Sequence, residues 1–212
     1  MSVRSAFLTP DHPALSHLAK RDARLKWVIA RLGGLRVRGV RSPSEHMICT
    51  IVGQMISTTA GNAVIARLET LCGGPLTAAR ISRFDPGALR GCGLSTRKAK
   101  YIAEFARYVT ENPCFLRDLE NCPDEEALAR LTALPGIGPW SAKMHLIFVL
   151  GRENVLPFED GAFAQGFRKL YGQEPTKEHA LARARRWSPY ASYAARLIYR
   201  ALDSGLLDEP HT

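Results

Sequence analysis

The sequence predicts an all-α protein. Apolar residues recur at spacings of three and four along nearly the whole chain, which is the period of an amphipathic helix. Runs that alternate apolar with polar residues between turn signals, as strands require, are scarce. The 212 residues and the 46% apolar content suffice for one large domain or for two small lobes. We expect about ten helices.

Start and stop signals place these helices along the chain. Ser42, Pro43 and Glu45 supply the N-cap, the first-turn proline and the capping-box acid of one helix. That helix is expected to continue to Cys72, because Gly73 is the first strong stop signal after it. The same rules predict further helices over residues 95–112, 123–135, 140–150, 160–171, 176–186 and 188–204.

The charge balance indicates an anionic partner. Lys and Arg number 29 against 20 Asp and Glu, which gives a formal net charge of +9. The apolar content excludes a disordered basic tail, so the charge lies on a folded body. A nucleic acid is the expected partner, although acidic proteins or anionic lipid would also explain the charge.

Neither a membrane segment nor a disulfide framework is expected. The longest apolar run, residues 145–150, falls far short of the ~20 residues that a spanning helix needs, and the first residues lack a signal-peptide pattern. The cysteines are odd in number and form no C-x-x-C pair, so we interpret them as reduced core thiols. These are Cys49, Cys72, Cys92, Cys114 and Cys122. We expect a cytoplasmic monomer, associated with the nucleoid in a bacterium or nuclear in a eukaryote.

The most specific stretch is residues 134–142, with the sequence LPGIGPWSA. Gly136 and Gly138 can adopt backbone angles closed to other residues, and Pro139 suits the first position of the next helix. Such a turn offers amide donors and a helix dipole to a phosphate group. Many turns between helices use the same residues only to reverse the chain.

This stretch resembles the hairpin of the helix-hairpin-helix DNA glycosylases, which reads L-P-G-[I/V]-G, then a diagnostic residue, then Ser/Thr-Ala. Residues 51–57, IVGQMIS, are similar to the I-V-G-Q-Q-L-S helix of the 3-methyladenine DNA glycosylase II branch. Gly93-Leu94-Ser95, with Lys98, Ala99, Tyr101 and Ile102, continues the likeness. Residues 156–160, LPFED, resemble the P-x-D-D segment of the branch. The resemblance covers residues 11–203.

The resemblance implies two helical lobes with a cleft between them. Residues 44–150 would form a central lobe that ends in the helix-hairpin-helix, and residues 1–43 with 151–212 would form the lobe that carries the catalytic aspartate. Longer members have an N-terminal β-rich domain, so this chain is expected to be a minimal form. The hairpin carbonyls of Leu134 and Gly136 are expected to hold Na⁺ or K⁺. No iron–sulfur cluster is expected, because no cysteine follows Cys122.

Asp160 is the catalytic carboxylate that the resemblance implies. Breaking the bond between base and deoxyribose builds positive charge on the sugar, which an ionised carboxylate stabilises while it orients a water. An Asp at a helix start is otherwise a cap. Glu159 takes the first acidic position of P-x-D-D, so either carboxylate could act.

Trp140 stands where members that also cut the DNA backbone carry a lysine nucleophile. The resemblance therefore implies a monofunctional hydrolase that leaves an abasic site, without β-lyase activity. Lys143, one helical turn further on, is the alternative nucleophile.

Several aromatic and apolar residues match substrate-pocket and wedge positions of the branch. Trp140 and Tyr190 match aromatic pocket positions, Trp187 matches a nearby aromatic, and Met144 falls where relatives have Tyr. Each of them could equally be a core residue. Met55 occupies the position of the wedge that fills the gap left by a flipped nucleotide.

The remaining expected DNA contacts are polar. Gln54 could contact the opposite strand or cap its own helix. The amides of Gly136, Ile137 and Gly138, with that of Trp140, are expected to bind phosphate. Three basic side chains at a helix start, where the dipole disfavours them, are expected to bind phosphate as well; they are Arg97, Lys98 and Lys100. The run of Arg183, Arg185 and Arg186 indicates a solvated helix face. The sequence does not decide the role of the loop that contains Arg36, Arg38 and Arg41.

The sequence thus predicts a monofunctional base-excision DNA glycosylase for alkylated purines, with 3-methyladenine as the leading substrate. The first alternative is the same enzyme acting on deaminated, etheno-adducted or oxidised purines. The second is a noncatalytic module that binds damaged DNA.

Overall fold

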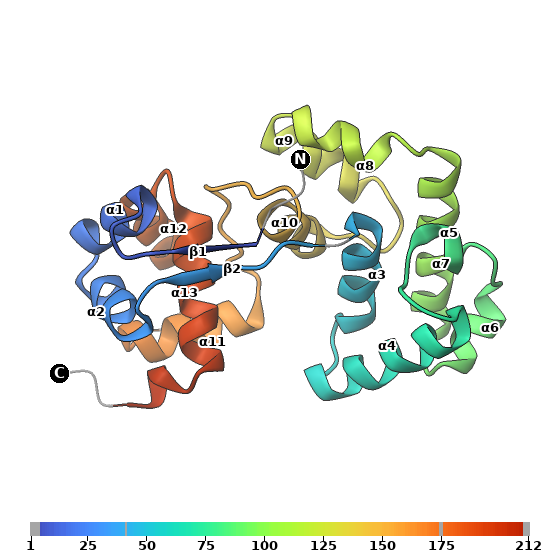
Figure 1. The fold of residues 1–212 in the computed structure, drawn as a ribbon, viewed down its shortest axis with the longest axis horizontal. Coiled ribbons are helices and arrows are strands. Elements are labelled where there is room, and N and C mark those ends of the chain that lie inside the picture. Colours follow the sequence, from blue (N-terminus) through green and yellow to red (C-terminus); the bar gives the residue numbers. More distant parts are fainter. Residues whose placement is uncertain (1–4, 41, 174–175, 210–212) are drawn as a thin grey trace. The chain divides into compact units, whose positions relative to one another are not determined.

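Helices make up most of the chain in the computed structural model, which describes residues 5–40, 42–173 and 176–209 (Figure 1). Thirteen α-helices lie within these described ranges. The prediction of an all-α protein is confirmed. Within the same ranges, no helix combines the length and the apolar character that crossing a bilayer requires.

The chain divides into two compact units. Unit 1 comprises described residues from 40 to 150, and unit 2 comprises those from 5 to 39 and from 151 to 209. Unit 1 contains α3 (Pro43–Gly53), α4 (Thr58–Cys72), α5 (Ala78–Ile81), α6 (Pro86–Gly91), α7 (Thr96–Glu111), α8 (Phe115–Asp118), η1 (Leu119–Asn121), α9 (Asp124–Thr132) and α10 (Pro139–Phe148). Unit 2 contains β1 (Ala6–Leu8), α1 (Pro13–Arg21), α2 (Ala23–Leu32), β2 (Leu35–Val37), α11 (Gly161–Tyr171), α12 (Lys177–Trp187), α13 (Ala191–Asp203) and η2 (Leu206–Asp208).

Local capping signals account for the helix starts that the sequence predicts. The Ser42 hydroxyl accepts a hydrogen bond from the Glu45 amide at 3.3 Å, and the Ser95 hydroxyl accepts one from the Lys98 amide at 3.3 Å. Asp160 caps α11 in the same way. The later predicted helices exist as well, with ends shifted by a few residues.

The prediction of one helix from Pro43 to Cys72 is wrong, because the helix ends at Gly53 and a second helix begins at Thr58. Met55, between them, has a left-handed φ of 55°. The Ser57 hydroxyl then caps α4 by accepting a hydrogen bond from the Ala60 amide at 3.2 Å. A serine that can satisfy the free amides of a new helix favours this restart.

A two-stranded antiparallel ribbon in unit 2 is a second departure from the prediction. β1 pairs with β2 (Figure 1). In this pairing Phe7 lies opposite Arg36. Three residues per strand are too few for alternation to be recognised in a sequence. Arg36 therefore lies in a strand and not in a loop, whereas Arg41 lies outside the described residues.

The cysteines are free thiols, but most of them are not core residues. Cys92 is buried and Cys114 is exposed, while Cys49, Cys72 and Cys122 have intermediate exposure. The prediction of core thiols therefore holds for Cys92 alone. Burial raises the pKa of Cys49 to about 11, so this thiol stays protonated.

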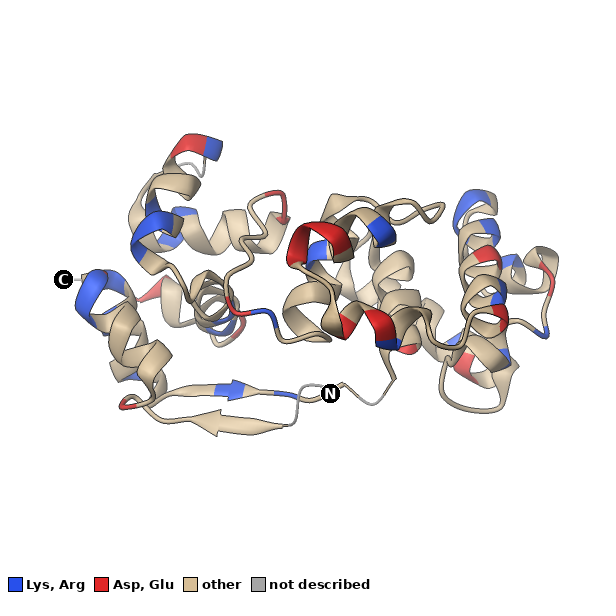
Figure 2. Cartoon of the chain, turned by 90° about the horizontal axis from the view of Figure 1, so that it is seen from above, with Lys and Arg blue, Asp and Glu red and all other residues tan. Residues whose placement is uncertain are grey.

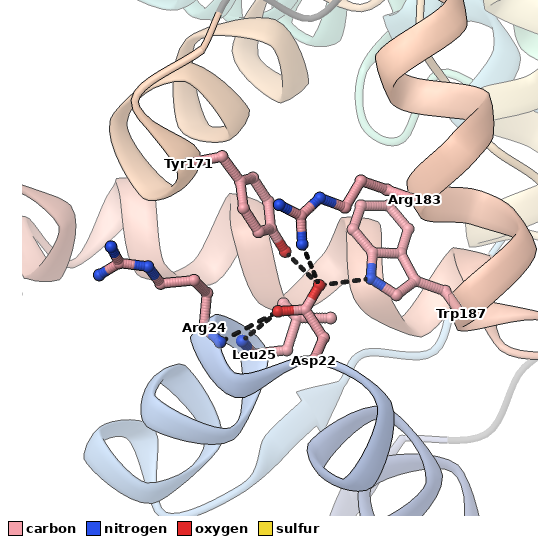
Figure 3. A network of polar contacts seen from close by, with 6 residues as sticks. All are labelled: Asp22, Arg24, Leu25, Tyr171, Arg183 and Trp187. Atoms are coloured by element: carbon pink, nitrogen blue, oxygen red, sulfur yellow. Dashed lines mark hydrogen bonds and ion pairs between the residues drawn. The ribbon is translucent and has the colours of Figure 1, made fainter.

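In unit 2, a buried carboxylate joins α2 to α11 and α12 (Figure 3). Asp22 is 3% exposed, and its Oδ1 accepts hydrogen bonds from the two backbone amides that open α2. Its Oδ2 accepts from the Tyr171 hydroxyl at 2.9 Å, the Trp187 indole at 3.0 Å and Arg183 at 3.4 Å. Burial, and then the Asp22 carboxylate, raises the pKa of Tyr171, so its hydroxyl remains a donor.

We predict that Asp22→Ala lowers the free energy of unfolding by about 3–5 kcal/mol. The variant loses an N-cap and leaves the Trp187 and Tyr171 donors buried without an acceptor. Urea denaturation measures this loss. Asp85→Ala is the matched control, because Asp85 caps α6 at an exposed site and its loss should cost about 1 kcal/mol. Equal losses in the two variants would contradict a stabilising role for the network.

A buried histidine lies in the core of unit 1. His145 of α10 is fully buried, and neither ring nitrogen has a hydrogen-bond partner within the described residues. Its ring centroid lies 6.2 Å from that of His46 in α3. Burial, with a smaller contribution from His46, lowers the pKa of His145 to about 3. The ring is therefore neutral in the folded protein at physiological pH.

We predict that the protein loses stability as the pH falls below about 6.5, the pKa of an unfolded histidine. The folded pKa is the lower one, so protonation favours the unfolded chain, and the loss grows as the pH approaches 3. At pH 4.5 the contribution of His145 is about 2–3 kcal/mol. Urea unfolding at pH 7 and pH 4.5 should show that His145→Leu removes this part of the pH dependence. Identical pH dependence in wild type and variant would contradict the prediction.

Candidate functional site

The hairpin between α9 and α10 is a tight turn that uses one of its own amides. Gly136 has a left-handed φ of 81°, and the Ile137 amide donates to the Leu134 carbonyl at 3.2 Å. Ile137 is 3% exposed. The prediction that the Ile137 amide binds phosphate is therefore wrong, because that amide closes the turn.

The amides of Gly136 and Gly138 remain available at this turn. No hydrogen bond in the described part of the chain uses either of them. Gly138 is exposed and caps α10, a position where no side chain accepts from the helix amides, and Pro139 has no N–H to offer. Free amides at the positive end of a helix dipole can bind an anion.

Tyr101 of α7 supports the hairpin from inside unit 1. A Cβ atom added to Gly136 would lie 2.3 Å from the Tyr101 ring, so the backbone and the ring are in direct contact. In the sequence, Tyr101 is only part of a matched motif. No local signal indicates this contact, because it depends on how α7 packs against the hairpin.

Gln54 and Lys98 form hydrogen bonds inside unit 1. The Gln54 amide nitrogen donates to the Gly136 carbonyl at 2.9 Å and to the Ser141 hydroxyl at 3.0 Å. Lys98 Nζ donates to the carbonyls of Val52 at 2.7 Å and Gln54 at 2.6 Å. The Gln54 side chain therefore bonds to residues far away in the chain and not to its own helix, and its expected contact with the opposite DNA strand stays a prediction. The Lys98 ammonium group thus binds the C-terminal end of α3, and its expected phosphate contact stays a prediction.

Met55 is fully exposed, at 101% of its reference area, and the next residue, Ile56, is 41% exposed. The Met55 side chain packs against nothing and gains no burial in the folded protein, whereas Ile56 is partly covered. The left-handed backbone of Met55 also costs on the order of 1 kcal/mol for a residue with a Cβ. Both observations are typical of a functional position.

Two of the basic residues predicted to bind DNA lie on the surface. Arg97 and Lys100 are exposed in the first turn of α7. The Lys100 ammonium lies 3.8 Å from Glu104 one turn later. Lys and Arg occur on helices of both units (Figure 2), and these two lie close in sequence to Lys98, whose side chain contacts α3.

Asp160 has intermediate exposure and caps α11. Its Oδ1 accepts a hydrogen bond from the Phe163 amide at 2.7 Å, which sets the orientation of the carboxylate. Burial, and then the Asp160 carboxylate, raises the pKa of Tyr199. Glu159 is exposed next to it. The sequence offered capping and catalysis as alternatives for Asp160, and its geometry is compatible with both.

The four predicted pocket residues differ in exposure. Trp140 in unit 1 and Tyr190 in unit 2 have intermediate exposure. The Tyr190 ring contacts those of His17 and Tyr193, with centroids 5.4 and 6.1 Å away.

Two of the pocket predictions are wrong. Trp187 is fully buried and donates to Asp22, and Met144 is 7% exposed, so both are core residues. A core position was the alternative expected for Trp187.

The carbonyls predicted to hold a monovalent cation each accept one hydrogen bond. The Leu134 oxygen accepts from Ile137, and the Gly136 oxygen accepts from Gln54. A carbonyl oxygen has two lone pairs, so each keeps one for a cation. The Na⁺ or K⁺ site stays a prediction. In the described part of the chain, no group of three His, Cys, Asp or Glu residues is arranged to hold a metal ion.

We predict that Gly136→Ala destabilises the protein strongly, whereas Gly138→Ala does not. Alanine at 136 combines a left-handed backbone with a contact of 2.3 Å to Tyr101, whereas a Cβ at 138 meets nothing within 4 Å. We expect Gly136→Ala to lose at least about 2 kcal/mol. Urea unfolding of the two variants measures the difference, and equal stability would contradict the described packing of Tyr101.

Comparison with known proteins places this geometry in a family. The profile of the HhH-GPD superfamily of base excision DNA repair proteins matches residues 48–191. The chain is 28% identical over 192 residues to DNA-3-methyladenine glycosylase 1 of Schizosaccharomyces pombe, which covers 87% of this chain and 84% of that protein. It is 38% identical over 153 residues to the DNA-3-methyladenine glycosylase of Saccharomyces cerevisiae, over 66% of this chain.

The chain is shorter than some of these relatives. It spans 51% of the Saccharomyces cerevisiae protein and 44% of a relative from Bacillus subtilis. A solved structure that it resembles over its length is the Schizosaccharomyces pombe 3-methyladenine DNA glycosylase in complex with abasic DNA. The TM-score is 0.82 at 28% identity, and the match covers 93% of this chain and 99% of that one. The chain belongs to the HhH-GPD superfamily of base excision DNA repair proteins.

Proposed function

We propose that this protein is a monofunctional DNA glycosylase that releases alkylated purines, with 3-methyladenine as the leading substrate, and leaves an abasic site. The observation that carries the proposal is the match over nearly the whole chain to a 3-methyladenine DNA glycosylase solved with abasic DNA. The relatives named DNA-3-methyladenine glycosylase support the same substrate class.

Asp160 is the proposed catalytic residue. Cleavage of the glycosidic bond leaves the sugar electron-poor, and a carboxylate with a fixed orientation stabilises that charge and aligns the attacking water. The hydrogen bond from the Phe163 amide supplies that fixed orientation. Glu159, which is exposed next to Asp160, is the second carboxylate to test.

The proposed DNA contacts come from three groups. The amides of Gly136 and Gly138 bind phosphate. The exposed basic side chains of Arg97 and Lys100 bind phosphate as well. Met55 enters the base stack when the damaged nucleotide leaves it, because an apolar side chain replaces the lost stacking.

The proposed pocket uses aromatic faces. An alkylated purine is cationic, and a cation over an aromatic ring gains about 0.5–2 kcal/mol. Trp140 of unit 1 and Tyr190 of unit 2, which keep part of their surface exposed, are each proposed to contact the alkylated base. Because Trp140 replaces the lysine of the lyase members, we propose hydrolysis without a covalent intermediate; a borohydride-trapped adduct lost on Lys143→Ala would contradict this.

We predict that Asp160→Asn lowers base release at least about 100-fold while the protein still folds and binds DNA. Asparagine caps helices as well as aspartate does, so α11 keeps its start. The measurement is chromatography of the bases released from methylated genomic DNA, with Glu159→Gln as the matched control that keeps activity.

Three outcomes would contradict parts of this proposal. Full activity of Asp160→Asn would remove Asp160 from the mechanism. Release of deaminated, etheno or oxidised purines but not of methylated purines from defined duplexes would change the substrate. Wild-type protein that binds alkylated duplex and releases no base would be a binding module.

A further inference from the structure

We infer that Gln54 and Lys98 are positioning residues for the Met55 turn: Gln54 joins it to the Gly136 hairpin and Lys98 joins it to α7, so that the wedge and the phosphate-binding amides form one rigid template. The inference rests on the proposed function, because it concerns the wedge and hairpin roles given there. It depends on four hydrogen bonds, all of them within unit 1.

The Met55 turn needs external support. Its φ of 55° is unfavourable for a residue with a Cβ, and its side chain contributes no packing. The backbone hydrogen bonds around it are long, with the Gln54 amide 3.4 Å from the Ile51 carbonyl and the Ile56 amide 3.5 Å from the Gly53 carbonyl. Local structure alone therefore holds this turn weakly.

Lys98 supplies support on one side of the turn. Its ammonium group donates to two carbonyls at the end of α3, those of Val52 and Gln54, at 2.7 and 2.6 Å. These carbonyls lie at the negative end of the α3 dipole, where a cation is favourable. Lys98 itself stands in the first turn of α7, where the dipole of its own helix disfavours a cation. Its contact with α3 explains that placement.

Gln54 supplies the link to the hairpin. Its side-chain amide donates at once to the Gly136 carbonyl and to the Ser141 hydroxyl, 82 and 87 residues away in the chain. Ser141 is 1% exposed in the first turn of α10. One side chain thus joins the residue before Met55 to both the hairpin and the start of the helix that follows it.

The consequence is a fixed geometry between two DNA-contacting elements before DNA arrives. Unstacking a base pair costs a few kcal/mol, and a wedge that had to be ordered during binding would add to that cost. A wedge already held relative to the phosphate-binding amides avoids the added cost. Neither Gln54 nor Lys98 needs to touch DNA to have this effect.

The test measures binding to two duplexes, one intact and one with a stable tetrahydrofuran abasic-site analogue, and takes the ratio of the two Kd values. The variants are Gln54→Met, Lys98→Met and Met55→Ala, each alone, and the first two each combined with Met55→Ala. We expect Gln54→Met and Lys98→Met to lower the preference for the abasic duplex about tenfold, and to have no further effect once Met55 is alanine. Additive losses, or an unchanged ratio, would overturn the inference.

Salt dependence separates positioning from direct contact for Lys98. A residue that binds phosphate reduces the slope of log Kd against log salt by about one when it is removed. We expect Lys98→Met to leave the slope unchanged and Lys100→Met to reduce it. A reduced slope in Lys98→Met would overturn the positioning role.

Two controls keep the test independent of folding and of catalysis. Arg107→Met removes a positive charge from an exposed site later in α7 and should leave the ratio unchanged. Urea unfolding identifies any variant that fails to fold, and if Gln54→Met does so, the Lys98→Met pair decides the question. Wild type that prefers the abasic duplex but releases no base would refute the proposed activity while leaving this test valid.

Discussion

The backbone of Gly136 is the point on which the geometry of the hairpin depends. Its left-handed φ and its contact with the Tyr101 ring leave room for no other residue. Its carbonyl accepts a hydrogen bond from the side-chain amide of Gln54, which lies in the turn after α3. The directions of the hairpin amides are therefore set by two distant helices as well as by the turn itself, which is how so short a loop can hold free donors in place.

Much of the fold could be predicted because its signals are local. Ser42 and Ser95 begin helices through hydrogen bonds to amides three residues away, so the sequence alone reveals them. The break at Met55 could not be predicted, because the left-handed residue depends on support from Lys98 and Gln54. The β1–β2 ribbon could not be predicted for a different reason, because the pairing of residues 6–8 with 35–37 leaves no periodic pattern in either segment.

Within the candidate site, the local hydrogen bond of Asp160 could be predicted from the sequence. Asp160 caps its own helix, and the same bond that identifies it as a cap also orients its carboxylate. The contacts of Lys98 and Trp187 could not be predicted, because their partners lie far away in the chain. Lys98 contacts a carbonyl 46 residues earlier, and Trp187 contacts an aspartate 165 residues earlier. Spacing along a sequence carries no information about such contacts.

The Asp22 network also affects the order in which the chain can fold during synthesis. Unit 1 is continuous, so its residues emerge from the ribosome together and can pack at once. Asp22 emerges early, but its donors on Tyr171, Arg183 and Trp187 follow about 150 residues later. Helices α1 and α2 can pack against each other early, but the side chains that join Asp22 to α11 and α12 become available only when most of the chain has been made.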